Sequence, residues 1–283
     1  MKYILVASCP DRIGIVHAVS DFFFLLGATI IEAAQYTDES NQRFFMRWKF
    51  GPGTQDLPLM KSLKGSFSTL ANTFGMDWEM YDTQAAPKIL LAVSKYGHCL
   101  NDLLHRWKEE KFPGEIVGVV SNHQKFQSKV ESYGLPYYHL PVNPANKQEQ
   151  EKRLLEIMEE KQVELLVLAR YMQILSDNLC AQVAGRAINI HHSFLPSFKG
   201  AKPYHQAFER GVKIIGATAH YVTKDLDEGP IIEQDVQRIE HFHGTSYMVD
   251  QGKNIETVVL ARAVMWHCQR RILLNGNKTV IFR

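Results

Sequence analysis

The chain has 283 residues, enough for one large domain or two of modest size with well-packed cores. Apolar residues make up 45% of it and charged residues 22%, which excludes disordered, collagen-like and coiled-coil proteins. Basic and acidic side chains number 32 and 30, and the net charge of +2 gives no reason to expect a nucleic-acid or acidic-membrane surface. We therefore expect a small molecule as the partner.

Nothing in the sequence predicts a membrane or secreted protein. The longest apolar run, residues 22–26, is far shorter than the roughly 20 residues that span a bilayer. The first apolar stretch reaches Asp11 and Arg12 too soon to form the core of a secretion signal. The four cysteines are scattered without a CxxC pair, which argues against a disulfide framework and a zinc site. We expect a cytoplasmic protein with free thiols.

A polar segment with a proline, residues 82–87, separates two differently patterned regions, so we predict domains at 1–84 and 85–283. In the first region Asp11 is predicted to cap the first helix, and alternating apolar residues over 44–50 predict a half-buried strand. The predicted strands cover 3–7, 29–35, 43–50 and 77–81. The first predicted helix follows the cap at Asp11 and has its apolar positions between 15 and 26, and the second covers 57–74. This βαββαβ order indicates an α+β, ferredoxin-like fold.

The first region resembles an ACT domain in residues 9–16 and 27–30. Its strand-to-helix turn has free backbone N–H groups that can hold the carboxylate of an amino acid. The resemblance implies an effector site and pairing of the domains, so that at least a homodimer is expected. The expected effector residues are Asp11, Arg12, Gly14 and Ile15. The alternative is a module for packing and oligomerisation that binds no ligand.

Strands alternate with helices after residue 87, which predicts a Rossmann-like α/β domain with a mostly parallel sheet. The predicted strands cover 88–93, 115–120, 137–140, 163–169, 187–190 and 217–222. The predicted helices start near 100 and 124 and cover 146–161 and 255–274. A turn at Asn275 and Gly276 is predicted to fold a last strand, 279–282, back beside the final helix.

Two strand ends carry groups suited to chemistry, because ligands of open α/β sheets bind beyond the carboxyl ends of the strands. Asn189 and His191 point to the same side of their strand, since side chains alternate with period two. Asp227, in an acidic loop after a later strand, is the candidate partner of His191. A structural role for these residues stays open. A metal site at His191, His192, His205 and His220 is disfavoured by their spacing, so no metal is expected.

The stretches Asn189–His191, Ser193–Gly200 and Leu226–Pro230 closely resemble the formyltransferases that use formyl-tetrahydrofolate. The resemblance implies that Asn189, His191 and Asp227 form the catalytic set. It also implies that residues 169–176 bind the pterin together with the loop 222–227. The expected substrate-binding residues are Met172, Gln173, Leu175, His192, Val222 and Asp225. Folate is then the substrate, and no cofactor is expected.

The family contains transferases and a hydrolase, and three features favour water as the acceptor. The loop 94–101 has one glycine where glycinamide ribonucleotide transformylases have a glycine-rich phosphate loop, although Lys95 and His98 could hold phosphate instead. His192 stands where many transformylases have proline, as in the deformylase branch of the family. An ACT-like domain ahead of the catalytic domain also resembles that branch. The implied reaction is hydrolysis of 10-formyltetrahydrofolate to formate and tetrahydrofolate, which balances one-carbon metabolism and supplies formate for purine biosynthesis.

Hydrolysis of a formamide needs an activated water and a stabilised tetrahedral oxyanion. We expect Asn189 to donate to the formyl oxygen, and a protonated His191, oriented by Asp227, to stabilise the developing charge. Asp227 is expected to hold or deprotonate the water and to pass a proton to the departing nitrogen. Two alternatives remain: a transferase to an amine such as glycinamide ribonucleotide, and a folate-sensing protein without chemistry.

Overall fold

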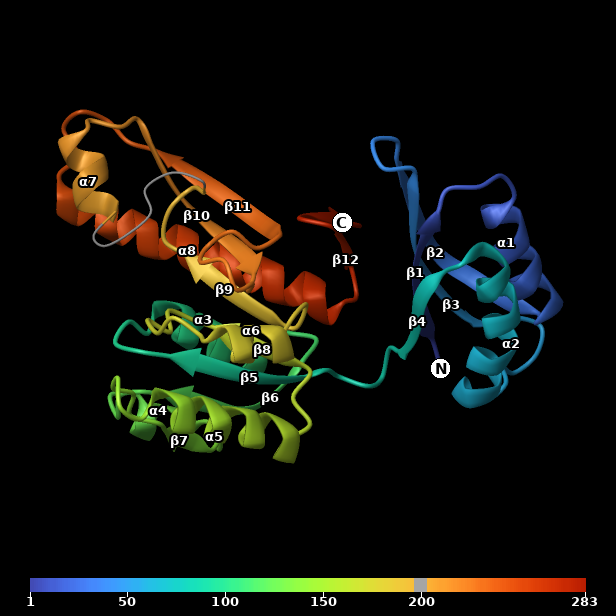
Figure 1. Ribbon diagram of the computed structural model, residues 1–283, viewed down its shortest axis with the longest axis horizontal. Helices are drawn as coiled ribbons and strands as arrows, with labels where there is room; N and C mark the ends of the chain where they lie inside the picture. Colours follow the sequence, from blue (N-terminus) through green and yellow to red (C-terminus); the bar gives the residue numbers. More distant parts are fainter. Residues whose placement is uncertain (196–202) are drawn as a thin grey trace. The chain divides into compact units, whose positions relative to one another are not determined.

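The computed structural model describes residues 1–195 and 203–283, which form two compact units (Figure 1). The first unit holds residues 1–86 together with 270–275 and 280–283, and the second holds 87–269 with 276–279. The predicted boundary near residue 85 lies between the units. The predicted second domain, 85–283, nevertheless extends too far, because most of the chain's last residues belong to the first unit.

The first unit is an antiparallel sheet with two helices, in the strand order β2-β3-β1-β4. Its elements are β1 (Tyr3–Pro10), α1 (Ile15–Leu25), β2 (Ala28–Asp38), β3 (Arg43–Pro52), α2 (Met60–Phe74) and β4 (Asp77–Asp82). Both helices bury an apolar stripe against the sheet, which includes Val19 and Phe23 from α1 and Phe67 from α2. The βαββαβ order and the ferredoxin-like topology are as predicted.

The predicted helix cap at Asp11 is wrong. The helix α1 begins at Ile15, and its N-cap residue is Gly14, which has a φ of 93° and no side chain to cap with. Glycine adopts this left-handed conformation without steric cost. Asp11 lies earlier in the turn, where its backbone N–H donates to the carbonyl of Gln42 at 2.8 Å. The residues that the sequence pattern assigned to the cap therefore belong to the turn that precedes the helix.

The prediction that β3 is half-buried is also wrong, since Phe45 and Arg47, on the face predicted to be solvated, are 0% and 3% exposed. The end of the chain packs with this unit, where β12 (Ile272–Asn275) and β13 (Lys278–Ile281) form a two-stranded sheet. Arg47 Nε donates to the carbonyl of Arg270 at 3.1 Å. Asn275 Nδ2 donates to Asp38 Oδ2 at 2.6 Å. The apolar alternation within β3 cannot show that residues from the other end of the chain pack on its second face.

The second unit contains a seven-stranded sheet in the order β11-β10-β9-β8-β5-β6-β7. The strands are β5 (Lys88–Val93), β6 (Glu115–Ser121), β7 (Tyr137–His139), β8 (Leu165–Leu168), β9 (Ala187–His191), β10 (Ile214–Tyr221) and β11 (Ile231–Arg238). The helices are α3 (His98–Lys108), α4 (Gln127–Ser132), α5 (Lys147–Glu160), α6 (Asp177–Gln182), α7 (Pro203–Glu209) and α8 (Thr245–Cys268). Strands β5 to β9 pair in parallel, whereas β10 and β11 are antiparallel. The predicted, mostly parallel α/β sheet is confirmed.

The strand order creates a switch point between β5 and β8. The chain runs outward from β5 through β6 to β7 and then returns to β8 on the other side of β5. Loops that follow β5 and β8 therefore diverge at the carboxyl edge, which is where such sheets bind ligands. Helices α5 and α6 pack on one face of the sheet, and α3 and α8 pack together on the other (Figure 1).

The structure also describes the cysteines, the apolar character of the helices and the bounds of the last helix. All four cysteines are buried and form no disulfide, as predicted. Within residues 1–195 and 203–283, no helix has the length and apolar character needed to cross a membrane. The final helix, predicted at 255–274, starts ten residues earlier and ends at Cys268, because the following residues form β12.

Asn275→Ala is expected to lower the free energy of unfolding by about 1–3 kcal/mol, because the buried Asp38 carboxylate loses a charge-assisted donor. Denaturant unfolding measures the difference. Asn277→Ala is the matched control, since Asn277 is exposed in the same hairpin, and it should change stability by no more than about 0.5 kcal/mol. Equal losses in the two variants would contradict a structural role for the Asn275 bonds.

Candidate active site

Strands β9 and β10 bring three polar side chains together. Asn189 and His191 occupy alternate positions on β9, and the antiparallel register places His220 of β10 opposite Asn189. Asn189 Nδ2 lies 3.2 Å from His220 Nε2. Asn189, His191 and His220 line one cavity, so the pairing of two neighbouring strands builds this part of the site.

Asp227 reaches the same place from the tight loop between β10 and β11. Its φ of 58° is uncommon for a residue other than glycine. The loop closes against β10 at Gly229, where an added Cβ would lie 1.7 Å from the carbonyl oxygen of Tyr221. Asp227 Oδ2 lies 3.1 Å from His191 Nδ1, and Oδ1 lies 3.7 Å from His220 Nε2. A constrained backbone thus directs one carboxylate at two imidazoles.

The hydrogen bonds assign protons to both rings. His220 Nδ1 lies 2.9 Å from the carbonyl oxygen of Tyr221, which can only accept, so this nitrogen carries a proton. His191 Nδ1 likewise donates to Asp227. The other nitrogen of His191, Nε2, is buried and has no hydrogen-bond partner among the residues that the structure describes. Nε2 is therefore the ring nitrogen of His191 that can form a hydrogen bond with substrate or water.

The electrostatics of the site separate the charged groups from the neutral ones. Burial raises the pKa of Asp227, but the interactions with His191, which donates a hydrogen bond, and with the nearby His220 outweigh burial and hold this pKa well below its usual range. Burial lowers the pKa of His192 to about 4, and the nearby charges of Arg170 and His191 act in the same direction. At neutral pH the site therefore combines an ionised Asp227 with a neutral His192.

The cavity beside these groups has a volume of about 240 Å³. Asn189, His191 and Asp227, expected as catalytic residues, all line it. Its walls also include five of the six side chains expected to bind substrate: Met172, Gln173, Leu175, His192 and Val222. Asp225 does not line it. The Asp225 side chain is exposed, and its backbone carbonyl accepts from Thr223 Oγ1 at 3.0 Å, so the loop turns this residue away.

The wall formed by residues 170–175 is fastened to the ends of two strands. Ser94, directly after β5, donates its backbone N–H to the carbonyl of Arg170 at 3.1 Å. Its Oγ accepts from the backbone N–H of Met172 at 2.9 Å and donates to Asn122 Oδ1 at 2.7 Å. Sequence reasoning missed Ser94 as a support of this wall. It considered His220 only as a metal ligand, although the position of His220 at a strand end was the available signal.

Other expected positions lie elsewhere. Asp11, Arg12 and Gly14 are exposed on the turn before α1, and the Ile15 side chain is buried in the core of the first unit. Residues 196–200 of the motif that continues from Ser193 lie outside the described residues.

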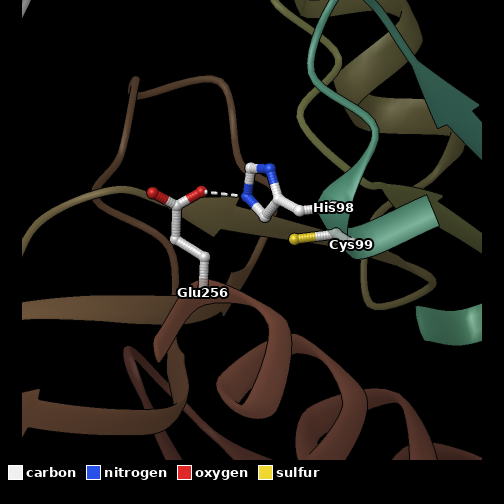
Figure 2. Close-up of side chains that lie close together, drawn as sticks. All are labelled: His98, Cys99 and Glu256. Atoms are coloured by element: carbon white, nitrogen blue, oxygen red, sulfur yellow. Dashed lines mark hydrogen bonds and ion pairs between the residues drawn. The ribbon is translucent and has the colours of Figure 1, made fainter. Parts of the chain in front are cut away.

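Within the described part of the chain, one group has the spacing of metal ligands: His98, Cys99 and Glu256 (Figure 2). His98 Nε2 lies 2.7 Å from Glu256 Oε2, and Arg170 Nε lies 3.4 Å from the same oxygen. Burial, together with the charge of Glu256, raises the pKa of Cys99 well above its usual value, so the thiol keeps its proton. A guanidinium beside a protonated thiol repels a cation and leaves a poor ligand. The group fits a hydrogen-bond network better than a metal centre.

The chain matches the Formyl transferase family over residues 87–264. Formyltetrahydrofolate deformylase from Corynebacterium sp. (strain P-1) is 48% identical over 100% of this chain and 99% of its own length. The crystal structure of a formyltetrahydrofolate deformylase from Pseudomonas syringae superposes with a TM-score of 0.96 and 46% identity, covering 100% of this chain and 95% of that one.

A transferase is also similar to part of the chain. Glycinamide ribonucleotide transformylase 1 from Symbiobacterium toebii has a TM-score of 0.65 and 27% identity, and the match covers 70% of this chain and 95% of that one. The similarity to the deformylases, in contrast, extends over both units of the structure. The chain therefore belongs to the formyltetrahydrofolate deformylases, within the formyl transferase family.

Proposed function

We propose that this chain hydrolyses 10-formyltetrahydrofolate to formate and tetrahydrofolate, with Asn189, His191 and Asp227 as the catalytic residues. The observation that carries the residue assignment is the contact of 3.1 Å between Asp227 and His191, in a cavity wall where His191 Nε2 has no partner among the described residues. Full-length similarity to deformylases supports the reaction. The folate is the substrate, and the proposal requires neither a metal nor a cofactor.

Two donors are positioned to stabilise the tetrahedral intermediate. One hydrogen of the Asn189 amide meets His220 Nε2, which leaves the other free to donate to the formyl oxygen. His191, held through Nδ1 by Asp227, offers Nε2–H to the same oxygen when it carries the second proton. The ionised carboxylate stabilises that charged imidazole. Preorganised donors of this kind supply much of the catalysis in acyl transfer.

The proton transfers are assigned to Asp227. A carboxylate with a strongly lowered pKa is a weak base toward free water. Once the water oxygen begins to bond to the formyl carbon, however, its protons become strongly acidic, and Asp227 can accept one. The proton then passes to the folate nitrogen as the carbon–nitrogen bond breaks, giving formate and tetrahydrofolate. Asp227 thus holds the water first and acts as a base only during attack.

The pterin is proposed to bind against residues 170–175 and Val222. This wall combines apolar side chains such as Met172 and Leu175 with backbone polar groups, and the neutral His192 lies beside it without adding charge. Asp225, expected from the sequence to contact substrate, is not part of this proposal because it lies outside the cavity.

Regulation and assembly are further parts of the proposal. The first unit, with its ferredoxin-like topology, is proposed to be an ACT domain that pairs in at least a homodimer and binds an amino acid at the turn from Asp11 to Ile15. The free, buried cysteines fit a reducing compartment such as the cytoplasm. Light scattering of the purified chain at several concentrations tests the assembly, and a concentration-independent monomer would contradict it.

Transfer to an amine is the second candidate, because the second unit is similar to a glycinamide ribonucleotide transformylase. Purified protein mixed with 10-formyltetrahydrofolate in the absence of amine separates the two. Hydrolysis predicts equal release of formate and tetrahydrofolate. Turnover that begins only after an amine is added would show that the chain is a transferase.

Asp227→Asn is expected to lower kcat by about a hundred- to a thousand-fold or more, because the amide neither holds a charged His191 nor accepts a proton. Steady-state release of formate measures the effect. Asp225→Asn is the matched control from the same loop, and its kcat and KM should stay within about threefold of wild type, since its side chain is exposed. Similar losses in both variants would mean that the loop as a whole matters, and not the Asp227 carboxylate.

The buried, neutral His192 predicts a pH-dependent stability. Its pKa in the folded chain is about 4, below the ordinary value near 6.5, so the unfolded chain binds the extra proton between these values. The free energy of unfolding is therefore highest above about pH 6.5 and falls as the pH drops toward 4. Between pH 7 and 5 wild type should lose about 1–2 kcal/mol more than His192→Gln. Parallel urea titrations check this, and identical losses would contradict a neutral, buried His192.

A further inference from the structure

His192 lines the catalytic cavity because β9 ends just before it. Neighbouring side chains of a strand point to opposite faces, so a strand that continued past His191 would direct His192 away from the cavity. The strand stops at His191 instead, and both rings line the cavity with their centres 4.9 Å apart. The proposed catalytic set uses His191 but assigns no chemical step to His192.

The ring nitrogens of His192 are available to a ligand. Among the described residues, three imidazoles line the cavity: His191, His192 and His220. Both nitrogens of His220 are engaged, one with a carbonyl and one with an amide. His191 Nδ1 donates to Asp227, and its Nε2 is assigned to the formyl oxygen. No residue that the structure describes forms a hydrogen bond with the His192 ring, which contacts only other rings.

The His192 ring is held in place and is neutral. It packs against Tyr204, with ring centres 6.4 Å apart and planes inclined by 72°. Tyr204 is itself fixed, since its hydroxyl donates to Glu256 Oε1 at 2.8 Å and a Cβ added at Gly252 would lie 2.1 Å from its ring. Burial and the charge of Arg170 lower the pKa of His192 to about 4. A neutral imidazole keeps one bare nitrogen, which can accept a hydrogen bond.

A water molecule is best presented as a nucleophile when two acceptors take its hydrogens, because its lone pairs then remain for the formyl carbon. Asp227 is the first acceptor in the proposed mechanism. We propose that the bare ring nitrogen of His192 is the second, so that His192 orients the attacking water and is a fourth catalytic residue. The inference rests on the proposed hydrolysis of 10-formyltetrahydrofolate.

The protons balance in this arrangement. The hydrogen bound to Asp227 moves to the carboxylate as the water oxygen bonds to the formyl carbon, and then passes to the folate nitrogen as the carbon–nitrogen bond breaks. The hydrogen bound to His192 stays on the oxygen and leaves with it as formic acid, which ionises to formate in water. His192 therefore remains neutral throughout and needs no strong basicity.

His192→Leu and His192→Gln test the proposal together. Leucine fills much of the same space without an acceptor, whereas the glutamine amide oxygen is a neutral acceptor. In steady-state formate release, His192→Leu should lower kcat about tenfold or more with KM for the folate within about threefold of wild type, and His192→Gln should stay within about threefold in both. His205→Leu, at an exposed histidine of α7, is the matched control and should behave as wild type.

Three results in this assay would overturn the proposal. They are a normal kcat in His192→Leu, a raised KM that accounts for its whole loss, and equal losses in His192→Leu and His192→Gln. A raised KM alone is what a role in folate binding predicts.

Hydroxylamine, added as a competing nucleophile, separates water positioning from a structural role. Its nitrogen attacks the formyl carbon without a base, takes the formyl group as formylhydroxamate and releases a proton that the folate nitrogen receives. In His192→Leu the ratio of hydroxamate to formate should rise about fivefold or more over wild type, and in His192→Gln it should stay within about twofold. An unchanged ratio in His192→Leu would contradict the proposal, because damage to folate binding or to the oxyanion donors lowers both products equally.

The remaining outcomes can be told apart. If His192→Leu fails to fold, His192→Met takes its place, since methionine adapts to irregular spaces and its sulfur is only a weak acceptor. A wild type that releases no formate in the absence of an amine would overturn the proposed hydrolysis and this inference with it. A wild type that hydrolyses the folate, with the same product ratio in His192→Leu, would overturn the role of His192 alone.

Discussion

The site depends on one half-buried carboxylate, that of Asp227, which lies between two imidazoles. A charge removed from water is costly unless it is paired and hydrogen-bonded, and Asp227 meets that requirement through the bond from His191 at 3.1 Å, with His220 Nε2 lying 3.7 Å from its other oxygen. The same pairing fixes the orientation of the His191 ring, which lines the cavity. It also places His220 where it orients the Asn189 amide. The strained backbone at Asp227 and the close approach at Gly229 persist because this pairing compensates for them.

Asp227 and Glu256 are two carboxylates with different surroundings. Asp227 lines the cavity and stays available to water, whereas Glu256 lies behind the wall with all of its charge committed to His98 and Arg170. Each has a pKa held down by hydrogen bonds and positive charge, against the effect of burial. The neutral His192 lies between the two groups.

Strand periodicity was enough to place Asn189 and His191 on one side, and the loop after the next long strand supplied Asp227. The same reasoning failed for Asp225, because only the backbone path decides which residues of a short loop face inward. The role of His220 was missed, because its partners are the carbonyl of the adjacent Tyr221 and the amide of Asn189 on the neighbouring strand. Glu256 gave no local signal at all, as its partners come from three distant segments of the chain.

The fold shows the same division between local and distant information. Most helices and strands followed from apolar spacing, but the cover of β3 by residues near 270 and the helix start after Gly14 did not. Periodicity reports which face of an element is apolar. It does not show which distant segment covers the other face, or that a turn moves the start of a helix by three residues.

The catalytic assignment depends on the proton of His191, which Asp227 fixes on Nδ1, and on that of His220, which the Tyr221 carbonyl fixes on Nδ1. Nitrogen-15 NMR of histidine-labelled protein observes those protons directly. The structure predicts a proton on Nδ1 of both rings, with the His191 signal shifted downfield by its bond to Asp227 and altered in Asp227→Asn. A His191 ring with a bare Nδ1, or a signal that Asp227→Asn leaves unchanged, would contradict the account.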